Sequence, residues 1–94
     1  MRIRILYMGM VRAKVGKREE EYEIEDGSSL SDLLGSLAQT YGKSFESIVY
    51  GRENRLDPTF IATVNGTLKD SLRASNIPLR EGDTIALMTL ISGG

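Results

Sequence analysis

Two glycines, Gly93 and Gly94, stand at the end of the 94-residue sequence, one residue after the largely apolar run 84–91. A glycine pair has no Cβ atoms and adopts backbone angles that other residues avoid, so it can enter a narrow channel. The reactive group here is the α-carboxylate of Gly94, presented on a thin stalk. This pattern suggests that the terminus is itself the substrate of another enzyme. The alternative is that a chain with 10 glycines carries the pair by coincidence.

The composition removes most rival chemistries. The chain has no cysteine and no histidine, so it lacks the usual thiol nucleophile, the commonest general base and the commonest metal ligand. No phosphate-binding glycine loop is present, and the aspartates lack metal-ligand spacing. The acidic run 19–26 could hold a cation, but such runs are usually solvated strand faces. We therefore expect no catalytic residue and no bound metal or cofactor.

Length and charge predict one small domain. A net charge of −1 gives no basic face of the kind that binds nucleic acid. The apolar runs are too short to span a membrane, and the N-terminus lacks a signal-peptide core. We expect a cytoplasmic protein with neither nucleic-acid nor membrane partners. Its folded domain should occupy residues 1–92 and its flexible tail residues 93–94.

The first part of the chain predicts a hairpin. Residues 2–8 alternate between the two faces of a half-buried strand. The basic residues 12–18 suit a turn, and residues 19–25 indicate a second, acidic edge strand. On the inner face of the first strand we place Ile3, Ile5 and Tyr7.

An amphipathic helix should follow this hairpin. Apolar side chains recur at helical spacing across residues 29–41, and Ser29 and Asp32 have the spacing of a capping box. Residues 45–49 predict a short further helical turn, and residues 51–58 a polar loop.

The second half predicts another hairpin and a closing strand. Residues 60–64 alternate as a strand, and Asn65-Gly66 is a strong signal for a tight turn. Residues 68–78 look irregular, and residues 84–91 form the last strand. Because one helix makes the crossover, this strand should run parallel to the first. The result is an α+β fold of the β-grasp, or ubiquitin-like, type: a mixed sheet of four to five strands with one main helix on one face.

The last strand also predicts a docking surface. Ile85, Leu87 and Thr89 should face the helix, which leaves the opposite face of the sheet without a covering helix. An exposed apolar patch there would lead to the tail, and such patches mark partner sites. A register error of one residue, or a covering loop at 43–58, would remove it. The expected partner-binding patch consists of Leu6, Met8, Ala86, Met88 and Leu90.

These motifs resemble a known family along the whole chain. The segment 81–94, which opens Glu-Gly-Asp and ends Gly-Gly, resembles the ending of the small subunit of molybdopterin synthase and its ubiquitin-like relatives. The segment 62–66, Ala-Thr-Val-Asn-Gly, resembles their "V-N" turn. Residues 5–7 with Val11, Arg12 and Gly16 resemble their first strand and loop.

One departure separates the chain from the molybdopterin subunits. Those proteins usually carry two prolines just before the tail, where this chain has Thr89 and Leu90. The Thr-Leu pair is similar instead to Urm-type carriers and some small archaeal modifiers. Without prolines the strand is free to continue pairing nearer the tail.

The resemblance implies that a ubiquitin-activating-type enzyme adenylates the carboxylate of Gly94, next to Gly93, with ATP and magnesium. The product would be a thiocarboxylate for molybdopterin synthesis or transfer-RNA thiolation, and the large subunit of molybdopterin synthase would be one partner. A second reading is a protein modifier that forms isopeptide bonds with lysines of target proteins, and one chain can play both roles. A third reading is a β-grasp interaction module with incidental glycines. In each case the chain is not itself an enzyme.

Overall fold

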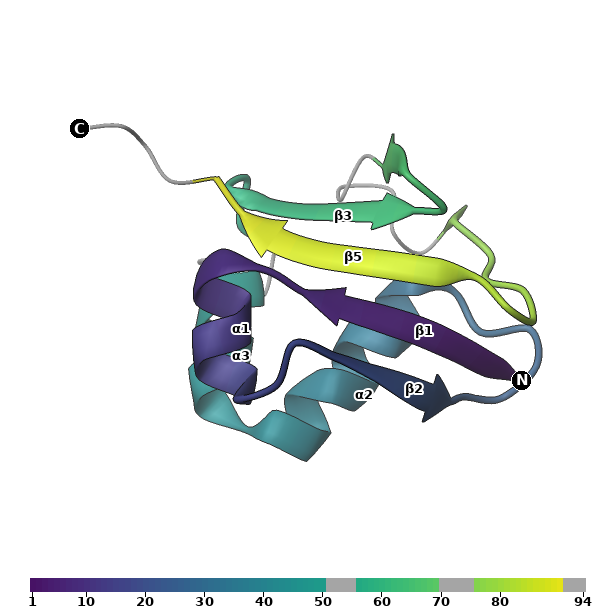
Figure 1. The fold of residues 1–94 in the computed structure, drawn as a ribbon, viewed down its shortest axis with the longest axis horizontal. Coiled ribbons are helices and arrows are strands. Elements are labelled where there is room, and N and C mark those ends of the chain that lie inside the picture. The colour runs from purple at the N-terminus through teal and green to yellow at the C-terminus, as the bar shows by residue number, and fades with distance from the viewer. Residues whose placement is uncertain (51–55, 70–75, 91–94) are drawn as a thin grey trace.

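The architecture is given by a computed structural model, which describes residues 1–50, 56–69 and 76–90. In chain order, its elements are β1 (Arg2–Tyr7), α1 (Gly9–Val15), β2 (Glu19–Glu23), α2 (Leu30–Tyr41), α3 (Lys43–Val49), β3 (Phe60–Val64), β4 (Thr67–Lys69) and β5 (Thr84–Thr89). The strands form one sheet in the order β2-β1-β5-β3-β4 (Figure 1). β1 and β5 run parallel, and the other neighbouring strands run antiparallel. The predicted β-grasp fold is confirmed, with five strands.

The main helix, α2, begins as its sequence predicts. The backbone N–H of Ser29 donates to Asp32 Oδ2 at 2.9 Å, and the N–H of Asp32 donates to Ser29 Oγ at 3.1 Å. This capping box satisfies backbone groups that the first turn leaves without partners, and such a cap stabilises a helix by about 1 kcal/mol. The buried stripe of α2 consists of Leu30, Leu33, Leu34 and Leu37.

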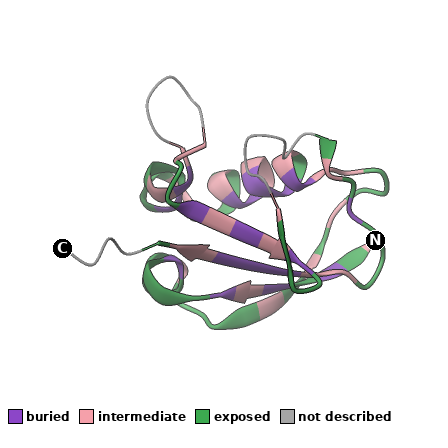
Figure 2. Ribbon diagram, turned by 90° about the horizontal axis from the view of Figure 1, so that it is seen from above, coloured by how far each residue is buried: buried purple, intermediate pink, exposed green. Residues whose placement is uncertain are grey.

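The core lies between α2 and the inner face of the sheet. Ile3, Ile5 and Tyr7 of β1 are buried there with Ile85 and Leu87 of β5. Along the central strands, buried segments alternate with less buried ones (Figure 2). The alternation in β1 confirms its predicted register. Ile85 and Leu87 of β5 pair with Ile5 and Tyr7, so they lie on the same inner face as predicted, although Ala86 between them is buried as well.

The turn predicted for residues 12–18 is wrong, because most of that segment belongs to α1. Gly9, at φ +56°, bends the chain sharply after β1. Val11 and Val15 lie four residues apart, which places both on one helix face; Val11 is fully buried and Val15 packs against the core. A short helix with two apolar anchors and exposed basic residues has too weak a hydrophobic period to be recognised from sequence.

The other boundaries differ less. α3 begins two residues earlier than the predicted helical turn. Asn65 and Gly66 have φ values of 52° and 84°, which confirms the tight turn. The short strand β4 differs from the prediction, which places no strand after the turn and an irregular segment from residue 68. Residues 51–55 and 70–75 of the predicted loops lie outside the described residues. No described helix is long and apolar enough to cross a membrane.

Candidate docking face and C-terminal site

The two terminal glycines, Gly93 and Gly94, lie outside the described residues. What the structure describes is the strand that leads to them. β5 runs through the middle of the sheet and ends at the opposite end of the molecule from the N-terminus (Figure 1). Just after it, the N–H of Leu90 donates to the carbonyl of Thr59 at 2.7 Å, which fixes the chain to the start of β3. The last described residue is therefore anchored.

The face of the sheet opposite α2, here called the open face, has an apolar centre. Leu6 on β1 pairs with Ala86 on β5, and Met88 pairs with Ile61 on β3. Ala86 is buried by its neighbours, while the other three are half-buried. We call these four residues the apolar strip. No described helix covers this face, which in Figure 1 is turned toward the viewer with α2 behind the sheet.

The predicted docking patch is distributed over this face and its end. Leu6, Ala86 and Met88 belong to the apolar strip. Met8 follows β1 directly and is 41% exposed, and Leu90 follows β5 and is 60% exposed. Leu90 also lines a separate hollow with Met10, Ile48, Thr89, Ser47, Asp57 and Thr59.

Sequence reasoning missed part of this surface. Ile61 and Thr63 lie on the open face, and Leu68, which pairs with Thr63, is 65% exposed. The positions of Ile61 and Thr63 on this face were predictable from the sequence, because these residues alternate with the buried residues Phe60 and Ala62. Leu68 gave no such signal, since β4 is only three residues long.

The open face has a charged margin along β1 and β2. Arg4 pairs with Glu19 at 3.1 Å, and Arg2 pairs with Glu23 at 3.1 Å and with Glu21 at 3.7 Å. All five side chains are well exposed, so these bridges add little to stability. Their effect is to frame the apolar strip with nearly neutral, polar surface, as at the rim of many interfaces.

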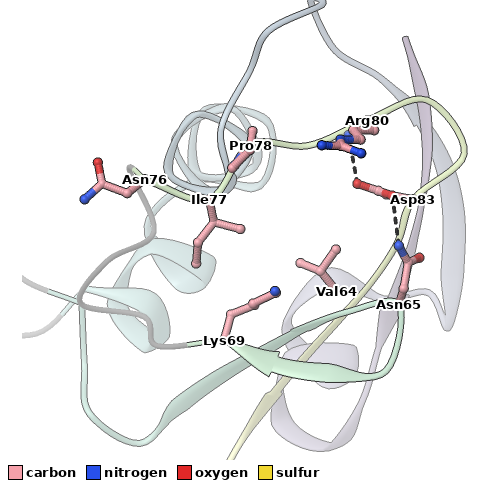
Figure 3. Close-up of a pocket in the computed structure, with 8 residues that line it drawn as sticks. All are labelled: Val64, Asn65, Lys69, Asn76, Ile77, Pro78, Arg80 and Asp83. Carbon is pink, nitrogen blue, oxygen red and sulfur yellow. Dashed lines mark hydrogen bonds between the residues drawn. The ribbon is translucent and has the colours of Figure 1, made fainter.

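A hollow of about 390 Å³ lies at the other end of β5, beside its first residues (Figure 3). Asp83 accepts a hydrogen bond from Asn65 Nδ2 at 2.9 Å and another from the N–H of Arg80 at 2.8 Å. Through these contacts the carboxylate joins the turn at Asn65 to the turn that precedes β5. The hollow is lined by Val64, Asn65, Lys69, Asn76, Ile77, Pro78, Arg80 and Asp83.

A cluster of titratable groups around Glu20 is structural. Tyr7 Oη donates to Glu20 Oε2 at 2.6 Å, Tyr41 Oη donates to the same oxygen, and Lys17 Nζ lies 3.5 Å from Oε1. Burial and the bond to Glu20 raise the pKa of Tyr7 well above its usual range. Burial alone would raise the pKa of Glu20, but the bonds from both tyrosines and the charge of Lys17 lower it overall. The cluster ties β1, β2 and α2 together.

The described residues contain no group of three or more acidic side chains, cysteines or histidines placed to hold a metal ion. Nor do their buried side chains leave any nitrogen or oxygen without a hydrogen-bond partner.

Several solved structures share this fold. SAMP1 from Haloferax volcanii is 20% identical, with 100% of each chain covered and a TM-score of 0.86. Urm1 from Trypanosoma brucei is 18% identical, with 99% of this chain and 95% of that chain covered and a TM-score of 0.76. One chain of the complex of subunit 1 and 2 of the molybdopterin-converting factor from Helicobacter pylori is 18% identical, with 100% of this chain and 100% of that chain covered and a TM-score of 0.62.

The sequence comparisons agree with this likeness. No curated protein matches the sequence, but the model of the ThiS family matches residues 5–94. That range begins within β1 and includes every later element and both terminal glycines. The expected relationship to the ubiquitin-like sulfur carriers and small modifiers is confirmed at the level of the family. The chain belongs to the ThiS family.

Proposed function

We propose that this chain is a ubiquitin-like sulfur carrier whose Gly94 carboxylate is activated by a separate adenylating enzyme. The observation that carries the proposal is the family match, which runs through the terminal glycines to residue 94. The described structure supports it, because β5 leads toward this end and the open face beside it is apolar. The chain is then a carrier and not a catalyst.

The chemistry follows from the poor reactivity of a carboxylate, whose oxide is a poor leaving group. An oxygen of Gly94 attacks the α-phosphorus of ATP, the bond to the bridging oxygen breaks, and pyrophosphate leaves. The resulting mixed anhydride releases AMP when a sulfur nucleophile attacks its carbonyl carbon. The activating enzyme supplies magnesium and the cationic groups that stabilise the developing charge. This chain supplies the carboxylate, the narrow Gly93-Gly94 stalk and the docking surface.

The docking surface proposed for the activating enzyme is the open face. Leu6, Met8, Met88 and Leu90 would contact it, and Ile61 extends the same surface. Ala86 lies on this face as predicted, but its neighbours bury it. Met8 and Leu90 are among the most exposed large apolar side chains of the described residues, and exposed apolar patches commonly mark interfaces. A downstream acceptor, such as a large molybdopterin synthase subunit, would bind the same face in turn. Among the structural relatives, the Helicobacter pylori protein is seen in a complex of subunits 1 and 2.

A second function shares the first chemical step. If a lysine amine attacks the mixed anhydride in place of sulfur, the product is an isopeptide bond to a target protein. Two observations support this second function: the structural likeness to SAMP1, with a TM-score of 0.86, and the Thr89-Leu90 pair where molybdopterin subunits usually have prolines. Expression of a tagged chain in its host should give conjugates that survive reducing agent and vanish when Gly94 is deleted. Their absence under several growth conditions would leave the carrier role alone.

Adenylation itself can be tested without knowledge of the sulfur acceptor. The chain is incubated with the host's activating enzyme, ATP, magnesium and labelled pyrophosphate. We expect pyrophosphate exchange into ATP that depends on the chain and is lost when Gly94 is deleted. Exchange that is unaffected by the deletion would contradict the proposal.

A further inference from the structure

A hollow at the end of β1 joins the open face to a pair of arginines. Its volume is about 460 Å³, and its lining residues are Leu6, Tyr7, Met8, Arg12, Arg18 and Glu19. Leu6 and Met8 belong to the proposed docking patch. The hollow therefore continues that patch onto the junction of β1, α1 and the start of β2, and it combines apolar walls with two guanidinium groups.

Arg12 is held in place by a neutral acceptor. Its Nε donates to the carbonyl oxygen of Tyr7 at 3.1 Å. An arginine carries five N–H donors in a planar fork, so this single bond orients the side chain and leaves its charge and most of its donors available. The backbone of Arg18 is fixed at the same point, because its carbonyl accepts from the N–H of Tyr7 at 2.8 Å.

The charges of Arg12 and Arg18 have no carboxylate partner among the described residues. The contrast with the same sheet is informative. Arg2 and Arg4 each pair with a glutamate of β2, and Glu19, which lines this hollow, is the partner of Arg4 at 3.1 Å. Both Arg12 and Arg18 are exposed. The end of the open face at Leu6 and Met8 therefore carries a local positive charge.

This combination selects one kind of occupant. Arginine pairs well with carboxylates through two parallel hydrogen bonds, and it is enriched among interface anchors beside apolar contacts. A nucleic-acid backbone suits the site less well, because the glutamates of the neighbouring margin are paired with Arg2 and Arg4 and offer a polyanion no further positive charge. The apolar strip alongside matches apolar side chains of a protein.

We propose that an acidic side chain of the activating enzyme occupies this hollow and pairs with Arg12 and Arg18 while apolar groups cover Leu6 and Met8. The inference rests on the proposed function, since it assigns a chemistry to the docking partner. It predicts that the two arginines contribute to binding and leave the adenylation step itself unchanged.

The test compares the affinity of the purified host activating enzyme for the chain and for the variant Arg12→Gln/Arg18→Gln. Calorimetry at low and moderate salt should show roughly tenfold weaker binding at low salt and a smaller dependence on salt. The matched control is Arg80→Gln, which removes an exposed arginine near the opposite end of β5 and should bind like the unchanged chain. The single variant Arg18→Gln, which leaves the bond from Arg12 to Tyr7 intact, should show part of the loss. Thermal unfolding of each variant checks the fold.

Pyrophosphate exchange separates this inference from the proposed function. The double variant should raise KM for the chain and leave kcat unchanged, whereas absence of exchange with the unchanged chain would sink the proposed function alone. Equal affinities of the double variant and the unchanged chain would overturn the inference, and so would an equal loss in Arg80→Gln. The remaining probe is a short single-stranded RNA. If the RNA bound only when both arginines were present, and the double variant kept its affinity for the activating enzyme, the hollow would be assigned to phosphate instead.

Discussion

The side chain of Asn65 joins the turn between β3 and β4 to the first residues of β5 by contacting Asp83. Asn65 Nδ2 donates to Asp83 Oδ1 at 2.9 Å, and Asn65 Oδ1 accepts from the N–H of Thr84 at 2.9 Å. The two residues belong to the separate motifs that carried the family resemblance in the sequence. In the folded chain they form one contact, which fixes where β5 begins.

Replacement of Asn65 by alanine should lower the free energy of unfolding by about 2–3 kcal/mol. Alanine loses both side-chain hydrogen bonds and must adopt the left-handed φ of 52°. The matched variant Asn65→Gly removes the same bonds but tolerates the backbone angle, so it should lose about 1–2 kcal/mol. Urea unfolding measures both. Equal stability of Asn65→Ala and the unchanged chain would show that the contact contributes nothing.

The Glu20 cluster predicts a specific acid sensitivity. Folding lowers the pKa of Glu20 below its ordinary value of 4.5. A lowered carboxyl pKa contributes stability above the ordinary pKa, and this contribution is lost as the pH falls through the folded-state value. Glu20→Gln should therefore lower the free energy of unfolding by about 1–2 kcal/mol at pH 7. As the pH falls below 4.5, the variant should lose less stability than the unchanged chain.

The control for this change is Glu25→Gln, which removes an exposed carboxylate with no hydrogen bond or ion pair among the described residues. It should keep the pH dependence of the unchanged chain. Chemical unfolding at several pH values between about 3 and 7 gives the comparison. If Glu20→Gln and Glu25→Gln gave the same profile, the hydrogen bonds from Tyr7 and Tyr41 would not govern acid sensitivity.

Met88→Glu tests the docking face directly. Met88 is half-buried at the centre of the open face, so a carboxylate there should disrupt an apolar contact while the fold is retained. Binding to the activating enzyme should weaken at least tenfold, as for a central interface residue. Gln39→Glu adds the same charge on an exposed position of α2, on the other side of the sheet, and should leave affinity unchanged. Loss of binding in both variants would indicate a general charge effect and not this face.

Much of this architecture was predictable because its signals are local. The stripe of α2, its Ser29–Asp32 cap and the Asn65-Gly66 turn each depend on a few neighbouring residues. The alternation of positions along β1 and β5 gave the correct inner and outer faces, and with them Leu6 and Met88. Ala86 lies on the predicted face but is buried there. The crossover rule gave their parallel pairing.

The features that sequence reasoning missed depend on tertiary contacts. α1 is held by Val11 and Val15, which provide too little periodicity to identify a helix. β4 owes its assignment to pairing with β3, since three residues have no alternation of their own. The hollow beside Arg12 and Arg18 depends on two tertiary features: α1 returns Arg12 to the carbonyl of Tyr7, and the pairing of β1 with β2 places Arg18 beside the same residue.

The central claim is that Gly94 is the site of activation, and the mass of the intact chain tests it most directly. The chain is incubated with the host activating enzyme, ATP, magnesium and a sulfide donor, and is then weighed by mass spectrometry beside variants lacking Gly94 or carrying Gly93→Ala. We predict the mass increase that corresponds to replacing one oxygen by sulfur, located on Gly94 by fragmentation and lost in both variants. An unchanged mass with an enzyme that activates its own known carrier, or a gain located elsewhere in the chain, would contradict the account.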